Sequence, residues 1–346
     1  MRRSGVFMNI IRHRAFARAG LIGNPTDGYG GKTIAFTIPE FVASVVIYPW
    51  ERLEILWSQE EQNRFDSIED LVNDVNQYGY YGGVRLVKAT IKRFADYCRA
   101  QQKPLHEGCF SIRYETNIPR GVGLSGSSAI ITATLKCLMG FYDISIPQVV
   151  QPSLVRAVEN DDLQIACGYQ DRVVQTYEGL VYMDFSNLQT DQGYSFGAYE
   201  HLDARVLPPV YLAYDLAAAK TSASVHGPLR TRVEDNTQLL DTMHRIAALV
   251  PPARTAIEGR DATGLHQLID QNFDLRSKLY TIRPHHLRMI AAARRVGASA
   301  KFAGSGGAIV GTCVDDAMYA QLVEHMSAES EHWRVIQPQI APVHLG

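Results

Sequence analysis

The sequence predicts an α+β protein made of two closely docked domains. Stretches with the apolar alternation of strands are clustered, and helical stretches between them would cover one side of the resulting sheets. The pattern changes near residue 186, after which a long, mostly helical region begins. No internal repeat and no low-complexity linker separates the two parts. We therefore expect an N-terminal domain over residues 1–186 and a C-terminal domain over 187–346.

The N-terminal half supplies most of the predicted strands. Residues 34–50 alternate as strands after a turn made by a pair of glycines, and 110–119 alternates as a strand that a proline ends. Within 80–101, apolar side chains fall on one face of a helix. Further elements are expected as helices over 127–142 and about 147–162, and as a short strand over 181–185.

The C-terminal half begins with a strand over 209–215 and continues with helices over 222–280, where two consecutive prolines separate two of them. Helix and strand then alternate to the end of the chain. The expected order is a helix over 285–297, strands over 300–304 and 308–314, a helix over 315–328 and a strand over 333–340.

The composition favours a globular protein that binds a small molecule. The 346 residues are 46% hydrophobic, which is enough for a sizeable core. Charged residues make up 20% and the net charge is −2, so the chain lacks the footprint of a protein that binds nucleic acid or an anionic membrane. No apolar run approaches the roughly 20 residues of a membrane span. The sequence does not predict an oligomeric state.

The cysteines and the N-terminal residues together predict a cytoplasmic protein. The five cysteines are odd in number and form no CxxC pair, which favours free thiols over disulfides or a zinc site. Arginines and a histidine interrupt the first twenty residues, so these lack the apolar stretch of a secretory signal. The cysteines are Cys98, Cys109, Cys137, Cys167 and Cys313.

A serine- and glycine-rich turn, PRGVGLSGSSA (119–129), opens the helix expected at 127–142. The N-terminus of a helix has unpaired backbone N–H groups and a partial positive charge, and glycines let the backbone curl around an anion. The serines add hydroxyl groups, one of which could face a metal ion. The residues predicted to surround a bound phosphate group are Gly121, Gly123, Leu124, Ser125, Gly126, Ser127, Ser128 and Ala129.

Two other interpretations of this turn stay open. Its glycines satisfy GxGxxG, and Asp143 lies near the acidic position of a dinucleotide-binding site. Asp143, however, closes a helix instead of ending a second strand, which favours a nucleoside triphosphate. The turn could also be a simple helix cap, but a cap needs one serine rather than three serines and three glycines.

Two more glycine-rich segments flank this turn in the sequence. RAGLIGNPTDGYGGKT (18–33) ends like a P-loop, but that pattern requires glycine where Thr26 stands, so the match fails. A strand-to-turn connection without a ligand explains this segment about as well as a functional role does. KFAGSGGA (301–308) contains more glycine than a hairpin needs, which favours close approach of backbone to a ligand.

The three segments together resemble the GHMP kinases, which include galactokinase and the homoserine, mevalonate and phosphomevalonate kinases. PRGVGLSGSSA resembles the family's phosphate loop, RAGLIGNPTD its N-terminal substrate motif and KFAGSGG its C-terminal glycine motif, in the same order. Within the family, GYQDRVVQTYEGLVYMDFS and RRVGASAKFAGSGGAIV are most similar to plant-type glucuronokinases. The resemblance implies a ribosomal S5 domain 2-like α/β domain followed by a ferredoxin-like α+β domain.

The resemblance also implies roles for the matching residues. Asp171, in GYQD, would be the catalytic carboxylate. Arg18 would lower the pKa of Asp171 or of the attacking hydroxyl and would stabilise the migrating phosphoryl group. Glu159 lies 12 residues before Asp171 and would bind Mg²⁺ together with Ser128. The residues implied in substrate binding are Arg18, Asp27, Asp171, Gly304, Ser305 and Gly306.

Each of these residues also has a plain structural explanation. Asp171 could cap the helix that QDRVVQTY predicts, Glu159 could be a solvated carboxylate at a helix end, and Arg18 could be a surface arginine.

The reaction implied is ATP- and magnesium-dependent phosphorylation of a sugar hydroxyl, with the C1 hydroxyl of glucuronate favoured. Asn24-Pro25 stands where galactokinase-type enzymes carry Glu-His, which argues against galactose. Another GHMP kinase, of the galactose, galacturonate or mevalonate type, and a non-catalytic sugar sensor remain alternatives. The sequence leaves open which basic side chain would pair with a substrate carboxylate. The candidates are Arg120, Arg172, Lys220, Arg230 and Arg276, and Tyr80 and Tyr81 are expected walls of the adenine pocket.

Overall fold

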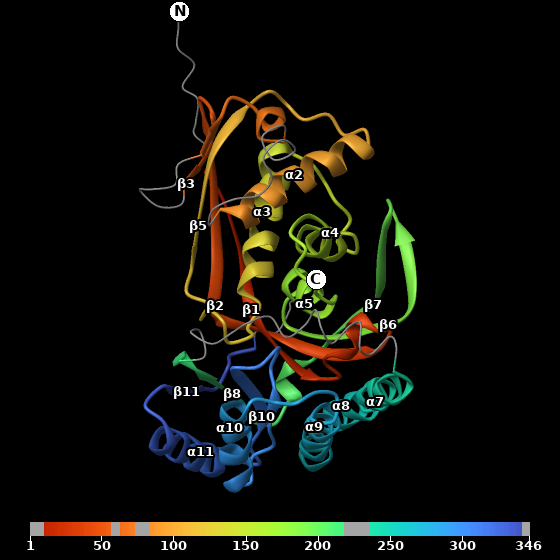
Figure 1. The fold of residues 1–346 in the computed structure, drawn as a ribbon, viewed down its shortest axis with the longest axis vertical. Coiled ribbons are helices and arrows are strands. Elements are labelled where there is room, and N and C mark those ends of the chain that lie inside the picture. The colour runs from red at the N-terminus through yellow and green to blue at the C-terminus, as the bar shows by residue number, and fades with distance from the viewer. Residues whose placement is uncertain (1–9, 57–62, 73–83, 218–235, 341–346) are drawn as a thin grey trace, which may run out of the picture.

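The computed structural model describes residues 10–56, 63–72, 84–217 and 236–340, and it contains two sheets with helices packed on them (Figure 1). This mixture of separate sheets and covering helices confirms the α+β class. The first sheet has seven strands. These are β1 (Ile11–Ile22), β2 (Lys32–Trp50), β3 (Leu53–Leu56), β4 (Asn63–Phe65), β5 (Cys109–Thr116), β6 (Leu180–Asp191) and β7 (Tyr194–Leu202).

Strand β2 organises the first sheet, whose order is β4-β3-β5-β2-β6-β7 with β1 also paired to β2. The first residues of β2 pair antiparallel with β6, and its second half pairs antiparallel with β5. Figure 1 shows the helices of this half lying between the β3–β5 side of the sheet and the β6–β7 hairpin. They are α2 (Arg85–Ala100), α3 (Gly126–Tyr142), α4 (Gln151–Ala157), which continues as the π-helical turn η2 (Val158–Asp162), and α5 (Gln170–Tyr177).

The second sheet has four strands in the order β11-β8-β10-β9, all antiparallel to their neighbours. Its strands are β8 (Val210–Asp215), β9 (Lys301–Phe302), β10 (Ala308–Thr312) and β11 (Trp333–Ile336). The helices of this half are α7 (Thr237–Ala247), α8 (Val250–Glu258), α9 (Ala262–Arg276), α10 (Pro284–Arg295) and α11 (Asp316–Glu329). Two short 3₁₀ turns complete the described elements, η1 (Thr26–Gly28) and η3 (Ala204–Val206).

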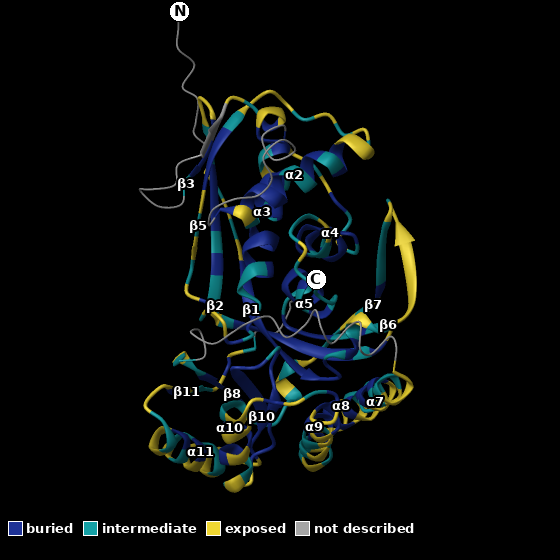
Figure 2. Cartoon of the chain, in the orientation of Figure 1, coloured by how far each residue is buried: buried dark blue, intermediate teal, exposed yellow. Residues whose placement is uncertain are grey.

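Helix α3 is the central helix of the first half, and its sequence explains its position. Apolar residues surround it on nearly all sides, as expected of a helix buried in a core, and most of its side chains are buried (Figure 2). The helix is bounded by two residues in the left-handed conformation, Ser125 at its start and Asp143 at its end. Asp143 therefore ends a helix, as the sequence predicts, and does not follow a second strand.

The two sheets share one hydrophobic core cluster. That cluster contains buried side chains of β1 and β2 together with Leu212 of β8 and Val310 of β10. At the junction, the backbone N–H of Gly20 donates to the carbonyl of Ala303 at 2.8 Å, and the rings of Phe41 and Tyr214 meet edge to face. A second cluster lies within the C-terminal half, between its sheet and α10 and α11.

Most of the predicted elements are confirmed, but several strands were not identified. The strand expected at 34–50 is part of β2, the helix at 127–142 is α3, and the paired prolines lie in the first turn of α8, just after α7 ends. The sequence analysis expected only a strand-to-turn connection from residue 18 on, where β1 runs from Ile11, and it did not identify β3, β4 or β7. Residues 80–83 of the helix expected over 80–101 lie outside the described residues.

The division into two domains remains a proposal, and the sheets favour a later boundary than residue 186. Strand β6 crosses that position, and β7 pairs with β6 in the first sheet. The second sheet begins with Val210. A boundary between Leu202 and Val210 would leave both sheets intact.

Candidate active site

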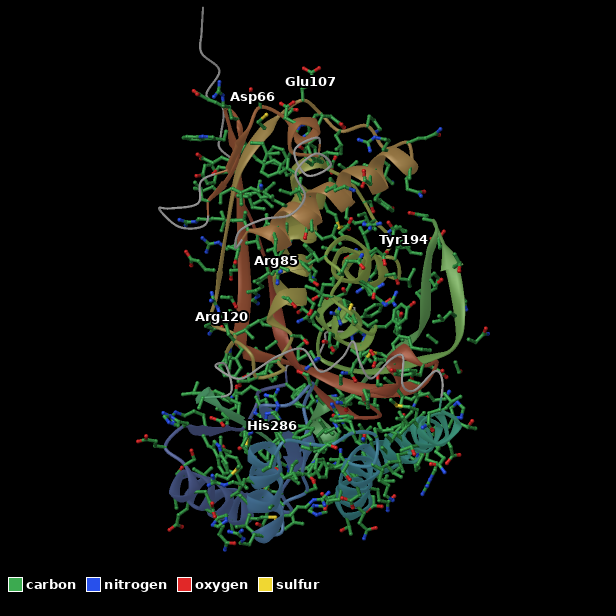
Figure 3. The ribbon with its side chains drawn as sticks, viewed as in Figure 1. Asp66, Arg85, Glu107, Arg120, Tyr194 and His286 are labelled. Atoms are coloured by element: carbon green, nitrogen blue, oxygen red, sulfur yellow. The ribbon has the colours of Figure 1, made fainter. Side chains whose placement is uncertain are left out.

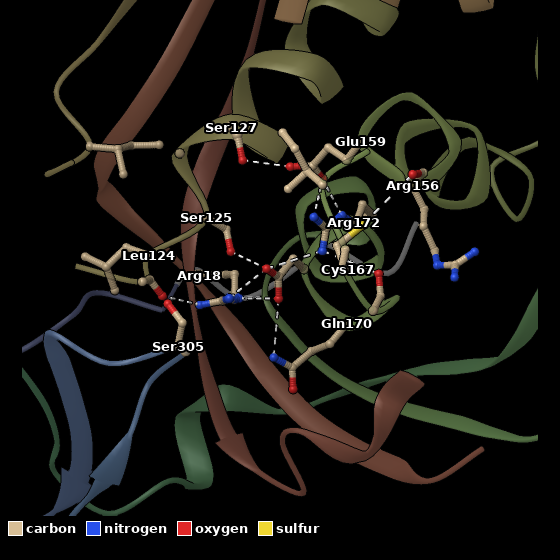
Figure 4. Close-up of a pocket in the computed structure, with 18 of the residues that line it drawn as sticks. Arg18, Leu124, Ser125, Ser127, Arg156, Glu159, Cys167, Gln170, Arg172 and Ser305 are labelled. Atoms are coloured by element: carbon tan, nitrogen blue, oxygen red, sulfur yellow. Dashed lines mark hydrogen bonds and ion pairs between the residues drawn. The ribbon is translucent and has the colours of Figure 1, made fainter. Parts of the chain in front are cut away.

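Three glycine-rich segments that are far apart in the sequence meet at the junction of the two halves. Arg18, near the middle of β1, donates from its backbone N–H to the carbonyl of Leu124 at 3.3 Å. Its guanidinium also donates to the carbonyls of Gly123 at 2.8 Å and Ala303 at 3.3 Å. One arginine therefore ties β1 to the turn before α3 and to the loop between β9 and β10 (Figure 4).

Glycine is required where the two loops touch. A side chain on Gly123 would lie 2.8 Å from the carbonyl oxygen of Gly306, and one on Gly304 would lie 2.1 Å from that of Gly123. Gly123 also has a φ of +77°, which disfavours any residue with a Cβ. These glycines allow backbone to pack against backbone beside the guanidinium of Arg18.

Asp171, in the first turn of α5, forms a two-point ion pair with Arg18. Arg18 Nε donates to Asp171 Oδ1 at 2.5 Å and Arg18 Nη2 donates to Asp171 Oδ2 at 2.7 Å. The Ser125 hydroxyl also donates to Oδ2, and Arg172 Nη1 lies 3.4 Å from it. The residue at the N-cap of α5 is Tyr169, and Arg18 is only 5% exposed. The helix-cap explanation of Asp171 and the surface explanation of Arg18 are therefore wrong.

The positive surroundings of Asp171 keep its carboxylate ionised. Burial alone would raise the pKa of Asp171, but the charges of Arg18 and Arg172 and the hydrogen bonds from Arg18 and Ser125 outweigh it. The net effect holds the pKa of Asp171 well below its usual range. The carboxylate is consequently better suited to orient a hydrogen-bond donor than to act as a strong base.

Glu159 lies in the π-helical turn after α4 and is almost fully buried, so it is not a solvated helix end. Its Oε2 accepts a hydrogen bond from Arg172 Nε at 2.7 Å, and a second one from Arg172 Nη2. Its Oε1 accepts from the hydroxyl of Ser127 at 2.7 Å. The expected pairing with Ser128 is not found: the buried Ser128 hydroxyl donates back to the carbonyl of Ser125 at 3.2 Å.

The difference between the two serines follows from helix geometry. Neighbouring residues on a helix point about 100° apart, so only one of the pair can face Glu159. Ser127 faces the π-helical turn that carries Glu159, whereas Ser128 faces the protein interior.

These residues surround one cavity of about 890 Å³. The residues predicted from the sequence that line it are Arg18, Asp27, Gly121, Gly123, Leu124, Ser125, Gly126, Ser127, Glu159, Asp171, Gly304 and Ser305. Three predicted residues are absent from its wall: Ser128 and Ala129 are buried in α3, and Gly306 lies against the ring of His286. Figure 3 locates His286 in the C-terminal half, where α10 begins.

Asp27 lies in η1 and faces the start of α5. Its Oδ2 accepts a hydrogen bond from the backbone N–H of Gln170 at 2.9 Å. A side chain on Gly168 would collide with the same carboxylate, so the close approach of the two segments requires glycine there. Asp27 and Asp171 thus lie on either side of Gln170, at one end of the same cavity wall.

Several lining residues could not be identified from the sequence. Arg172 was considered only as a carboxylate ligand, yet it pairs with Glu159, from which it is separated by 13 positions and a change of helix. Asn24 and Gln170 line the cavity too; they lie inside the quoted motifs, but no role was assigned to them as ligands, and Arg156 lies outside every motif. Four other candidates, Tyr80, Tyr81, Lys220 and Arg230, lie outside the described residues.

The cavity contains oxygen ligands that suit Mg²⁺. Mg²⁺ takes few protein ligands and completes its octahedron with phosphates and water. The Ser127 hydroxyl and the Glu159 carboxylate provide two hard oxygen ligands side by side on the cavity wall. Within the described part of the chain, no cluster of three or more His, Cys, Asp and Glu side chains is arranged around a metal.

Two further expectations can be compared with the structure. All five cysteines are free thiols. None of the helices in the described ranges has the length and apolar character that crossing a bilayer requires.

Comparison with known proteins identifies close relatives over nearly the whole chain. Residues 85–179 match the family model of the GHMP kinases N terminal domain. Glucuronokinase 1 of Arabidopsis thaliana is 41% identical over 321 residues, which cover 91% of this chain and 88% of the relative. Probable glucuronokinase 2 of the same plant is 39% identical over 352 aligned positions, covering 99% and 95%. The crystal structure of Lactococcus lactis galactokinase with galactose has a similar fold, with a TM-score of 0.73, 16% identity and coverage of 96% and 94%.

Proposed function

The chain belongs to the GHMP kinases, in the family of the glucuronokinases, and from this premise we propose that it converts D-glucuronate and ATP to D-glucuronate 1-phosphate and ADP. Membership makes it a sugar kinase, that is, a phosphotransferase that uses ATP and has a sugar hydroxyl as acceptor. The observation that carries the choice of substrate is the near 40% identity to two plant glucuronokinases over almost the full chain.

In the proposed reaction, the C1 hydroxyl oxygen attacks the γ-phosphorus of ATP. A new oxygen–phosphorus bond forms, the bond between the γ-phosphorus and the bridging oxygen breaks, and ADP leaves with the electron pair. The proton of the hydroxyl passes to Asp171 or to solvent. Since the transition state of phosphoryl transfer is loose, alignment and charge stabilisation matter more than the strength of the base.

We assign the roles of the residues on the geometry of the cavity. The turn over 121–127 would hold the phosphates with the backbone N–H groups at the start of α3. Arg18 would steady both Asp171 and the transferred phosphoryl group, because its guanidinium lies between the carboxylate and the loops. Asp27, Gly304 and Ser305 would contact the sugar.

We propose that Ser127 and Glu159 hold the magnesium ion, with Ser127 in the place first expected for Ser128. Bound Mg²⁺ would neutralise phosphate charge and orient the γ-phosphoryl group. Arg172 would hold the Glu159 carboxylate in position. A cytoplasmic location is proposed as well, supported by the five free thiols.

The test is a substrate panel with the wild-type protein, in which ADP release is measured with glucuronate, galacturonate, galactose and mevalonate. We expect turnover on glucuronate, a 1-phosphate product by ³¹P NMR, and loss of activity when magnesium is chelated and recovery when it is restored. Turnover on a neutral sugar alone would leave a kinase with another substrate. Tight ATP binding without turnover on any substrate would support a sugar sensor.

A further inference from the structure

A buried arginine that has no acidic partner in the described part of the chain lines the cavity. Arg276, the last residue of α9, is only 2% exposed. Its Nε donates to the hydroxyl of Tyr280 at 2.8 Å, but its buried Nη1 has no hydrogen-bond partner among the described residues. Burying a guanidinium in this state is unfavourable, because the cost of removing a charge from water is normally offset by an anion. An anionic ligand in the cavity would supply what is missing.

The other basic residues considered for a substrate carboxylate are less suitable. Arg172 already pairs with Glu159 and lies near Asp171, and Arg18 pairs with Asp171. Arg120 lines the cavity but is exposed to solvent, where an ion pair contributes little (Figure 3). Of the basic residues considered and described, Arg276 alone is buried, faces the cavity and lacks a carboxylate.

The end of α9 that carries Arg276 packs against the loop after β1. Asn272 lies one turn earlier on the same face of α9, accepts from the backbone N–H of Gly23 at 2.7 Å and donates to the carbonyl of Asn24 at 3.3 Å. These bonds fix α9 against the loop after β1. The guanidinium carbon of Arg276 lies 5.3 Å from the centre of the Phe302 ring and 5.9 Å from that of Tyr280, so two aromatic rings limit its movement.

A second buried basic side chain, Lys301, lies near Arg276. Lys301 is fully buried, and among the described residues its Nζ donates to uncharged oxygens, those of Gly20, Asn24 and Phe302. Burial, together with the nearby charges of Arg276 and Arg18, lowers the pKa of Lys301 well below its usual value. A bound anion next to Arg276 would relieve this repulsion.

One rival has a similar environment. Arg156 also lines the cavity, its buried Nε has no hydrogen-bond partner in the described ranges, and its guanidinium lies 4.5 Å from the centre of the Tyr169 ring. It is only half-buried, however, and it lies on α4, one turn before Glu159, which places it on the phosphate side of the cavity. A matched substitution of Arg156 therefore provides the control.

We propose that Arg276 binds the carboxylate of the sugar acid through its guanidinium fork and thereby makes the enzyme select acidic sugars over neutral ones. The inference rests on the proposed sugar-kinase function and adds the residue that determines its substrate class. A neutral sugar in the same place would leave Arg276 unpaired, and this unpaired charge is the source of the discrimination.

The test compares D-glucuronate with D-glucuronamide, its uncharged carboxamide, in wild type, Arg276→Met, Arg276→Lys and Arg156→Met. Methionine keeps most of the volume against Phe302 and Tyr280 but removes the charge. Wild type should prefer glucuronate by about 100-fold in kcat/KM. Arg276→Met should lose about 100-fold on glucuronate, mainly through KM, and change less than about threefold on glucuronamide. Arg156→Met should change both substrates by the same factor.

The outcomes separate this inference from the proposed function. Wild type without turnover on any sugar acid would contradict the function itself. Wild type with a carboxylate preference that persists in Arg276→Met, or that disappears in Arg156→Met instead, overturns only the role of Arg276. If Arg276→Met does not fold, as judged by circular dichroism and ATP binding, Arg276→Lys decides. Lysine keeps the positive charge but lacks the guanidinium fork, so Arg276→Lys should lose about tenfold in kcat/KM on glucuronate and not on glucuronamide. Wild-type kcat/KM on both substrates would refute the proposal.

Discussion

The role of Asp171 follows from the groups that surround its carboxylate. Two nitrogen atoms of Arg18 and the hydroxyl of Ser125 already donate to its carboxylate, and its pKa is held well below its usual range. Such a carboxylate is a weak base at neutral pH, so its contribution to catalysis would come mainly from aligning the sugar hydroxyl.

We expect Asp171→Asn to bind ATP with unchanged affinity and to lose roughly 10²- to 10⁴-fold in kcat. Asparagine keeps the size but cannot hold the fork of Arg18 or accept a proton. Single-turnover kinetics together with ATP titration measure both quantities. Asp184→Asn is the matched control, since Asp184 pairs with Lys32 away from the cavity wall. Near-wild-type kcat in Asp171→Asn would remove Asp171 from the catalytic machinery.

The sequence identified most residues of the candidate site but few of their contacts. Arg18 and Asp171 are 153 positions apart, so only the fold brings them together. Ser127 and Ser128 are equally suitable hydroxyls in the sequence, and only the direction of each side chain on α3 distinguishes them. The unpaired nitrogen of Arg276 is likewise a property of packing, which the sequence pattern does not contain.

At the scale of elements, the contact between the turn before α3 and the loop after β9 holds the cavity in shape. Two glycines of that turn have different roles. Gly123 has a positive φ and no space for a side chain, whereas at Gly126 a Cβ would make only ordinary contact with Ile118, at 3.5 Å.

We therefore expect Gly123→Ala to lower the free energy of unfolding by more than about 2 kcal/mol, through backbone strain and a clash with the carbonyl of Gly306. Gly126→Ala, in the first turn of α3, should leave it unchanged or raise it by up to about 1 kcal/mol, because alanine favours helix. Urea denaturation of both variants measures the difference. Equal effects of the two substitutions would mean that the loop contact does not constrain Gly123.

Elements with a strong periodic pattern were predicted well. The strands that were missed show which features of a sequence obscure a strand. Strand β1 contains three arginines and a glycine, and the position of Arg18 inside the protein depends on its ion pair with Asp171. Strand β7 is partly exposed along most of its length, so its side chains give little apolar alternation. Pairing with β2 and β6 makes these segments strands, and such long-range pairing is not visible locally.

At the scale of the whole molecule, the two sheets share a core cluster and backbone hydrogen bonds at their junction. Because each half buries part of its apolar surface against the other, we expect them to unfold together. A variant carrying Trp50→Phe and Trp57→Phe keeps Trp333, in β11, as its single tryptophan and as a reporter of the second sheet. Its thermal midpoint by fluorescence should agree within about 2 °C with that by far-UV circular dichroism. Two separated midpoints would support independent domains.

The hydrogen bond between Ser125 and Asp171 has a consequence for the state in which ATP is bound and the sugar is absent. A water molecule in the cavity beside ATP would meet an Asp171 carboxylate that already accepts hydrogen bonds from Arg18 and Ser125. In the proposed mechanism, such a water would compete with the serine hydroxyl for Oδ2, and it would have few other contacts to favour that exchange. A sugar that other residues of the cavity also hold would displace the serine hydroxyl more readily. If Asp171 has the proposed role, the Ser125 hydroxyl would therefore slow hydrolysis of ATP in the absence of sugar.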